Sequence, residues 1–190
     1  MRKVFKILLV LFLLFPFSIY ADRDKVELFK CVDGDTARFI YKKQEIKVRF
    51  LGINAPETEK DDKDAEPYGE DSANYVCRKL KNAKKIELEY DKESDKTDKY
   101  DRTLAYVFLD DKLLEVDILK KGYATVKYAK KSFKYYDDLV NAEEYAKEKK
   151  HGIYSDKEYI MSKEEKKNIV KSVTKYIKKL ISNVLREIFD

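Results

Sequence analysis

Residues 32–57 read VDGDTARFIYKKQEIKVRFLGINAPE, and this stretch decides the fold. Two runs within it, residues 36–41 and 45–53, are rich in β-branched and aromatic side chains, a composition that is typical of β-strands. A short polar link joins the two runs, so we predict a tight β-hairpin. In the second run Ile46, Val48 and Phe50 fall on one face of the strand, and this face is expected to be buried.

Polar side chains gather at one end of the predicted hairpin. The expected pairing places Thr36 opposite Arg49, with Asp35 one step away, and the chain returns Asn54 and Glu57 to the same end. Two carboxylates, an amide oxygen and nearby backbone carbonyls suit a hard cation such as Ca²⁺. A guanidinium beside them suits a phosphate, and a carboxylate that does not bind the metal could activate water.

The remaining elements follow from the spacing of apolar residues. Strands are predicted at residues 26–32, 85–90, 104–109 and 123–126, and helices at residues 68–82, 113–121 and 133–149. Short strands joined by long crossovers predict a small closed barrel. The expected fold class is therefore α+β, an OB-fold barrel of five strands with about three helices.

Several segments match a known family in order and spacing. They are residues 33–36 (DGDT), 48–57 (VRFLGINAPE), 68–69 (YG), 82–87 (NAKKIE), 97–102 (TDKYDR) and 104–106 (LAY). Through these segments the chain resembles the staphylococcal (thermo)nuclease family over about residues 25–155. The resemblance implies an OB-fold barrel that hydrolyses DNA and RNA with Ca²⁺. It also implies cleavage between phosphorus and the 5′ oxygen, which leaves 3′-phosphates.

The resemblance further implies a metal site. Asp35 would be the anchoring ligand, Ala55 would offer its backbone carbonyl, and Asn54 stands where the family usually has a second aspartate. The neutral amide removes one negative charge, so we expect weaker Ca²⁺ binding. Residues 57–66 carry six acidic side chains against two lysines, where the best-known member has a basic loop. An acidic rim of this kind repels polyanions.

Catalytic and substrate-binding roles come from the same resemblance. Glu57 would act as general base or would position the water. Arg49 and Arg102 would bind the scissile phosphate and stabilise the charge that develops in the transition state. The residues expected to contact the bound nucleotide are Lys99, Tyr100 and Tyr128.

The N-terminus has the pattern of a secretory signal peptide, residues 1–21. Three basic residues among the first six precede an apolar run, and the small residue Ala21 ends that run, so cleavage is expected there. The alternative is an uncleaved leader that anchors the chain, although the run is short for a membrane span. Both readings place the remaining chain outside the cytoplasm, either secreted or at the cell envelope.

Cys31 and Cys77 are the only cysteines of the chain. An exported pair can form a disulfide, which here would close a loop of about 45 residues. Two separate buried thiols are the alternative, because sequence does not give the separation of the Cα atoms.

The composition limits the other function classes. The 190 residues hold 41 lysines and arginines against 36 aspartates and glutamates, and most of this excess lies in the leader. Bulk charge alone therefore does not indicate nucleic-acid binding. The single histidine argues against a Ser-His-Asp hydrolase. The rival hypothesis is a non-catalytic OB-fold module that binds nucleic acid, and no obligate protein partner is predicted.

The chain is expected to divide into the OB-fold domain, residues 22–155, and a C-terminal extension, residues 156–190. Within the extension, residues 162–189 predict an amphipathic helix that opens with a capping box of Ser162 and Glu165. Its apolar residues recur at helical spacing opposite lysines; they are Val170, Val173, Ile177, Leu180, Ile181, Val184 and Ile188. Packing on the barrel, self-association and docking to a membrane surface all agree with this pattern.

Overall fold

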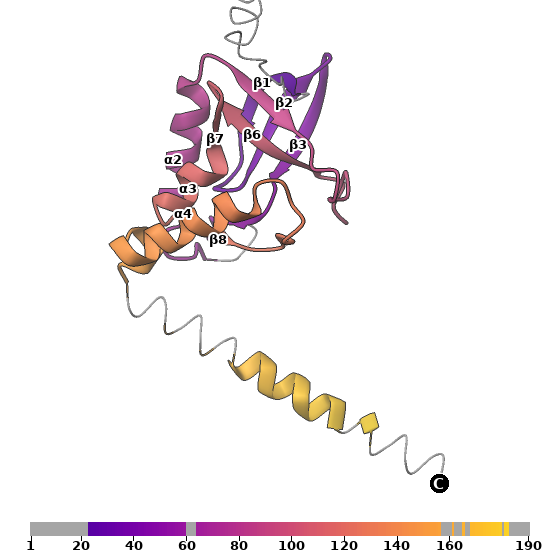
Figure 1. Ribbon diagram of the computed structural model, residues 1–190, viewed down its shortest axis with the longest axis vertical. Helices are drawn as coiled ribbons and strands as arrows, with labels where there is room; N and C mark the ends of the chain where they lie inside the picture. The colour runs from indigo at the N-terminus through magenta and orange to yellow at the C-terminus, as the bar shows by residue number, and fades with distance from the viewer. Residues whose placement is uncertain are drawn as a thin grey trace, which may run out of the picture.

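The structure is a computed structural model that describes residues 23–59 and 64–156, and in the C-terminal segment residues 161, 165, 168–179, 181 and 182. The predicted signal peptide and the capping residue Ser162 lie outside the described residues. Figure 1 shows the strands of residues 23–156 wrapped into a barrel, with the helices gathered along one side of it.

A closed barrel of five strands forms the body of the fold. The strands are β1 (Asp24–Cys31), β2 (Thr36–Tyr41), β3 (Gln44–Phe50), β5 (Ile86–Glu89) and β6 (Thr103–Leu109). Antiparallel pairs run in the order β3–β2–β1–β5–β6, and a parallel pairing of β3 with β6 closes the ring. This arrangement confirms the predicted α+β fold with an OB-type barrel. The short strands β4 (Ile53–Asn54) and β8 (Thr125–Val126) pair with each other, and β7 (Lys112–Leu113) pairs antiparallel with the end of β6.

The β2–β3 hairpin has the predicted register, with Thr36 opposite Arg49. Lys42 and Lys43 turn the chain with φ angles of 47° and 68°. Two successive left-handed residues are what a two-residue hairpin turn requires, because their twist matches that of the strands. The second strand ends earlier than predicted because Gly52, with a φ of 83°, turns the chain into β4.

Within residues 23–156, three α-helices and one 3₁₀ turn accompany the barrel. They are α2 (Gly69–Asn82), α3 (Leu114–Lys120), α4 (Tyr136–Lys149) and η1 (Gly152–Tyr154). Each helix contributes to one continuous core with the inward side chains of the strands, such as Phe39, Phe50 and Tyr106. The apolar stripe predicted for α2 is buried at Val76 and Leu80.

Two links tie β1 to the rest of the barrel. Cys31 at its end forms a disulfide with Cys77 of α2, with the Cα atoms 5.5 Å apart. Arg23, which precedes the strand, places its guanidinium carbon 3.4 Å from the ring centroid of Phe108 and donates from Nε to Glu89 at 2.8 Å. The structure thus pairs the two cysteines.

Glu115 on α3 is a carboxyl group buried completely in the core. The backbone N–H of Val107 donates to its Oε1 at 3.0 Å and approaches its Oε2 at 3.3 Å. Burial raises the pKa of Glu115 to about 8, because these hydrogen bonds do not replace the lost water. The folded protein therefore keeps a proton on Glu115 that the unfolded chain releases above its ordinary pKa of 4.5.

We expect the stability of the protein to fall as the pH rises from 5 to 8, because over this range the unfolded state binds fewer protons than the native state. Glu115 alone would contribute on the order of 3 kcal/mol to this loss. The Glu115→Gln variant should lose clearly less stability over the same range. Urea denaturation followed by circular dichroism at each pH measures this, and parallel losses in both proteins would contradict the raised pKa.

Candidate active site

Asp35 lies in a tight turn that enters β2 and is only 5% exposed. Its backbone N–H donates to Asp33 Oδ1 at 3.1 Å. Gly34 allows this turn to press against its neighbours, because a Cβ there would lie 2.0 Å from Ser72 Oγ of α2 and 2.6 Å from Ala55 Cβ. The turn therefore holds one carboxylate buried against the segment that follows β3.

Arg49 on β3 joins the groups that the hairpin brings together. Its Nη2 lies 3.0 Å from Asp35 Oδ2 and donates to Asn54 Oδ1 at 3.2 Å. Its Nη1 donates to the carbonyl oxygens of Phe50 and Ile53 at 3.0 and 2.8 Å. The structure thus brings Asp35, Arg49 and Asn54 into one hydrogen-bonded group.

These contacts give Arg49 a task that the sequence did not predict. A guanidinium has five N–H donors, and three of those of Arg49 donate to protein acceptors. Its Nη2 also forms the ion pair with Asp35. Arg49 thus contacts both Asp35 and Asn54, and its predicted role in binding the phosphate stays a prediction.

The electrostatics of Asp35 reflect its burial. Desolvation raises the pKa of Asp35 to about 6, Arg49 opposes this rise, and the nearby Asp33 adds to it. Hydrogen bonds from the Ala55 N–H at 2.7 Å and the Thr36 hydroxyl at 3.0 Å favour the charged form. At neutral pH Asp35 is therefore mostly ionised, with Arg49 as its partner.

The oxygens around Asp35 are of the type that a hard cation binds. Asp35 supplies a carboxylate, Asn54 an amide oxygen and Ala55 a backbone carbonyl, and Ca²⁺ prefers such ligands. Among residues 23–59, 64–156 and the described part of the C-terminal segment, no three His, Cys, Asp or Glu side chains cluster to hold a metal. Asn54 Nδ2 donates to the Ala55 carbonyl at 3.1 Å. The donor set thus fits Ca²⁺ in type, with a single carboxylate.

Glu57, the predicted base, follows two residues after Ala55 and has an exposed side chain. Its carbonyl oxygen accepts from the Glu66 N–H at 2.9 Å, and its N–H donates to Glu66 Oε2 at 3.3 Å. The start of α2 packs on the same carbonyl, since a Cβ at Gly69 would lie 2.2 Å from it. The helix therefore fixes the backbone of Glu57.

Arg102 immediately precedes β6, the strand parallel to β3, and Val48 of β3 pairs with Thr103. From this register Arg102 lies roughly 7 Å along the strand direction from the level of Arg49. Asp98 holds Arg102 by accepting from its Nε at 2.8 Å and from its backbone N–H at 3.0 Å. Burial raises the pKa of Asp98, but these hydrogen bonds outweigh burial and keep it below its ordinary value.

Two large aromatic rings among the predicted substrate-binding residues are open to solvent. Tyr100 is 66% and Tyr128 73% exposed. Lys99 Nζ lies 4.9 Å from the ring centroid of Tyr100, and Lys127 Nζ lies 5.1 Å from that of Tyr128. Exposed rings beside cations are what proteins use to stack bases and contact phosphates of single strands. Lys99 and Tyr100 group with Arg102, whereas Tyr128 stands on the loop after β8.

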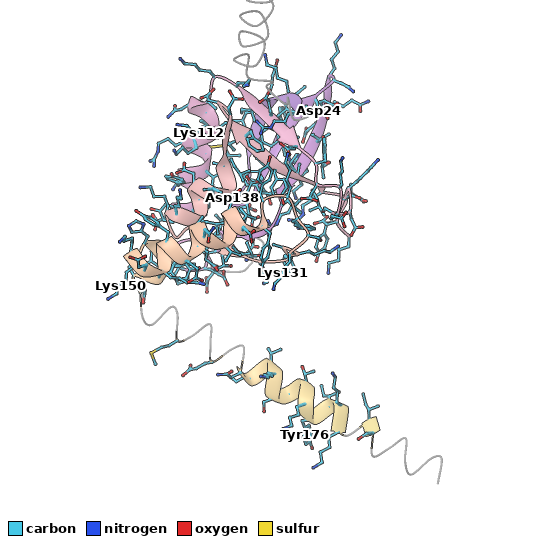
Figure 2. All side chains as sticks on the ribbon, in the orientation of Figure 1. Asp24, Lys112, Lys131, Asp138, Lys150 and Tyr176 are labelled. Atoms are coloured by element: carbon cyan, nitrogen blue, oxygen red, sulfur yellow. A yellow bond between two sulfur atoms is a disulfide. The ribbon has the colours of Figure 1, made fainter. Side chains whose placement is uncertain are left out.

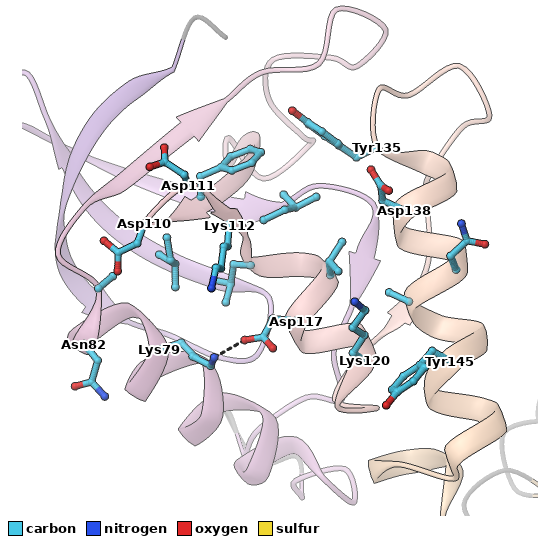
Figure 3. Close-up of a pocket in the computed structure, with 18 residues that line it drawn as sticks. Lys79, Asn82, Asp110, Asp111, Lys112, Asp117, Lys120, Tyr135, Asp138 and Tyr145 are labelled. Atoms are coloured by element: carbon cyan, nitrogen blue, oxygen red, sulfur yellow. Dashed lines mark ion pairs between the residues drawn. The ribbon is translucent and has the colours of Figure 1, made fainter. Parts of the chain in front are cut away.

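A groove of about 1020 Å³ lies elsewhere on the barrel. It is lined by the end of α2, the β6–β7 turn, α3 and α4, and Figure 3 shows Lys79 paired with Asp117 there, at 2.5 Å. None of the predicted site residues lines this groove. The candidate site therefore lies outside this groove, at the rim of the barrel where β2 begins and β3 ends.

Sequence reasoning missed three contacts that build the rim. They are Ser72 against Gly34, Gly69 against the Glu57 carbonyl, and the Asp98 clamp on Arg102. The motifs DGDT and YG contain the two glycines, but a glycine does not reveal which side chain its missing Cβ makes room for. The contact of Asp98 with Arg102 could not be predicted from the sequence, because both residues lie in a polar loop without a recognisable pattern.

A closed OB barrel whose rim joins a buried carboxylate, hard oxygen donors and two arginines defines a domain suited to a phosphate ester and a hard cation. The family profile described as Staphylococcal nuclease homologue matches residues 47–156, more than half of the chain. The chain therefore belongs to the staphylococcal nuclease family.

Three relatives show how far the likeness extends. Endonuclease YncB of Bacillus subtilis (strain 168) is 40% identical over 139 residues, which cover 73% of this chain and 65% of that protein. The SPbeta prophage-derived endonuclease YokF of the same organism is 39% identical over 156 residues, covering 78% and 52%. The thermonuclease of Staphylococcus hyicus is 32% identical over 135 residues, covering 71% and 78%. The chain thus spans less than two thirds of the two Bacillus relatives.

The two arginines should differ in what they do for stability. Replacing Arg49 by Ala leaves Asp35 buried without its partner, so we expect a loss of about 3–5 kcal/mol in the free energy of unfolding. Replacing Arg102 by Ala breaks a pair at the surface and should cost about 1 kcal/mol or less. Urea denaturation of the two variants at pH 7 compares them. Equal losses would show that Arg49 does not hold the rim together.

Proposed function

We propose that this chain is a Ca²⁺-dependent nuclease that hydrolyses phosphodiester bonds of DNA and RNA. The observation that carries the proposal is the connected group of Asp35, Arg49, Asn54 and Ala55, with Arg102 directly before the neighbouring strand β6. Hard oxygen donors beside guanidinium groups can hold a cation and a phosphate at the same time. Two of the relatives are an endonuclease and a thermonuclease by name, which agrees with this function.

Arg102 is the better candidate of the two arginines for binding the phosphate. The Asp98 carboxylate contacts Nε and Nη2 of Arg102. Within the described residues, both N–H groups of Nη1 are therefore available to a ligand. Arg49 adds its Nε–H and keeps Asp35 in place. Charge that develops on the phosphoryl oxygens would be stabilised by these fixed donors. The exposed rings of Tyr100 and Tyr128 can stack against the bases of the bound nucleotide.

Glu57 is proposed to receive the proton of the attacking water. The water oxygen bonds to phosphorus, the bond between phosphorus and the 5′ oxygen breaks, and that oxygen takes a proton from solvent, to which Glu57 later returns its own. The products are a 3′-phosphate and a free 5′-hydroxyl. Asp35, Asn54 and Ala55 would hold Ca²⁺, which supplies Lewis acidity and neutralises phosphate charge when bound.

We further propose that the enzyme acts outside the cytoplasm, secreted or at the cell envelope. Two observations support this location: the signal-peptide pattern of residues 1–21 and the disulfide between Cys31 and Cys77. Disulfides persist in oxidising compartments. An exported chain whose N-terminus is Asp22 would agree with the proposal, and an intracellular chain with its leader intact would not.

A non-catalytic binding module remains the second candidate, because one observation favours it. Asn54 supplies no charge, and its amide N–H occupies the Ala55 carbonyl that a cation would use. The acidic side chains of residues 57–66 also repel a polyanion. This candidate predicts binding of single-stranded DNA without cleavage at saturating Ca²⁺.

The chain from Asp22 onward should cleave single-stranded DNA when CaCl₂ is added and stop when a chelator removes the metal. Arg102→Ala should lower kcat about 100- to 1000-fold, and Glu57→Gln about 100-fold or more. Glu59→Gln in the same loop is the matched control and should keep full activity. Gel-based cleavage rates measure this, and a folded chain that binds DNA without cutting it at millimolar Ca²⁺ would leave the binding module as the function.

Asn54→Asp should strengthen the metal site. With Arg49 beside Asp35, the donor set carries no net charge, and a second carboxylate would make it negative. We expect the CaCl₂ concentration for half-maximal cleavage to fall about tenfold or more. Asn82→Asp at the end of α2, which lines the distant groove, is the control for added charge and should leave this concentration unchanged. An unchanged value in Asn54→Asp would place the metal elsewhere.

A further inference from the structure

Residues 168–179, 181 and 182 are helical, and we call them the C-terminal helix. Figure 1 draws this helix in yellow. Its apolar side chains are between 49% and 66% exposed; they are Ile169, Val170, Val173, Tyr176, Ile177 and Ile181. Figure 2 shows the labelled Tyr176 extending from this helix. Packing on the barrel, one of the interpretations of the sequence, does not cover these side chains in the structure.

The two faces of the C-terminal helix are cleanly separated. At about 100° per residue, its apolar side chains span about 140° of the helix circumference. The four lysines, at positions 171, 175, 178 and 179, span about 100° on the opposite side. Residues 168–182 contain no acidic side chain. The helix therefore presents a broad apolar face and a polar face on which every charged side chain is a cation.

This cationic charge contrasts with that of the rest of the chain. Residues 22–156 hold 29 lysines and arginines against 31 aspartates and glutamates, whereas residues 157–190 hold 9 against 5. The barrel is thus slightly acidic, and the positive excess gathers in the C-terminal segment. An anionic surface would attract the helix while leaving the barrel free.

The nature of the two faces favours one occupant over the others. A second copy of the helix could cover the apolar face, but it would leave the lysines in water without the acidic partners that paired helices use. Nucleic acid would engage the lysines but leave the broad apolar face in water. A bilayer rich in anionic lipid satisfies both faces, because acyl chains accept the apolar residues and headgroups accept the lysines.

We propose that the C-terminal helix docks in the plane of membranes rich in anionic lipid and holds the barrel at their surface. Its apolar face would lie at the boundary between headgroups and acyl chains, with Tyr176 at one edge of that face. None of the helices in the described residues is long and apolar enough to cross a bilayer. Attachment of this kind is reversible and weakens as salt rises.

Sedimentation with lipid vesicles tests the proposal on the chain from Asp22 to Asp190. Vesicles of phosphatidylcholine with an equal amount of phosphatidylglycerol should bind the chain at least about tenfold more tightly than vesicles of phosphatidylcholine alone. Val173→Gln with Ile177→Gln should weaken binding about thirtyfold or more. Ser172→Gln with Thr174→Gln is the matched control, because it changes the same helix outside the apolar face, and it should bind as the parent does.

The lysines should contribute to vesicle binding independently of the apolar face. Lys175→Gln with Lys179→Gln should weaken binding to the anionic vesicles about 25-fold at low salt, since each lysine near such a surface is worth about a factor of five. Circular dichroism and the melting temperature of the barrel should be the same in all these variants. A drop in melting temperature would instead mean that the helix packs on the protein.

Several outcomes would overturn the proposal. Absence of vesicle binding, with a dimer in light scattering that the Val173 and Ile177 changes abolish, would identify a second copy as the partner. Absence of vesicle binding, with a barrel destabilised by removal of residues 157–190, would indicate packing in the groove of α3 and α4. Binding to an oligonucleotide that depends on the lysines alone, without vesicle binding, would indicate nucleic acid. Equal binding to both vesicle types would remove the anionic surface from the proposal.

Discussion

The buried ion pair of Arg49 and Asp35 is the interaction on which the rim depends. It joins the turn before β2, the end of β3 and the segment at Asn54 and Ala55. A buried pair of this kind contributes little net stability, because desolvation of both charges offsets their attraction. Its value here is geometric, since it fixes where the oxygen donors stand.

The pair also determines the charge of the site. Asp35 is balanced by Arg49, and Asn54 is neutral, so a cation that enters the rim meets oxygen dipoles and one compensated carboxylate. Arg102 is held separately by Asp98 and leaves part of its guanidinium open. The two arginines therefore differ in their surroundings: Arg49 is buried beside Asp35 and Asn54, whereas Arg102, paired with Asp98, is partly exposed.

The sequence predicted the hairpin and its register because alternating side chains and a short polar link allow only one pairing that buries Val48 and Phe50. The association of Asp35, Arg49 and Asn54 followed directly from that register. The number of hydrogen bonds that Arg49 donates to the protein did not follow, because it depends on how closely the Gly34 turn and the Gly52 turn approach.

The complete burial of Glu115 could not be predicted either, since its neighbours LLEVD read as an ordinary helix start. The sequence also did not decide what contacts the apolar face of the C-terminal helix, because the same spacing of apolar residues suits packing in a protein core and binding to a lipid surface.

The parallel pairing of β3 with β6 closes the barrel between strands more than 50 residues apart in the sequence. Contacts of such high sequence separation are costly in loop entropy and tend to form late in folding. Arg49 lies on one strand of this pair, and Arg102 immediately precedes the other. A chain that has not yet folded therefore holds the two guanidinium groups on separate pieces of polypeptide. The complete site exists only once β3 and β6 have paired, so nucleic acid near the unfolded chain does not meet an assembled site.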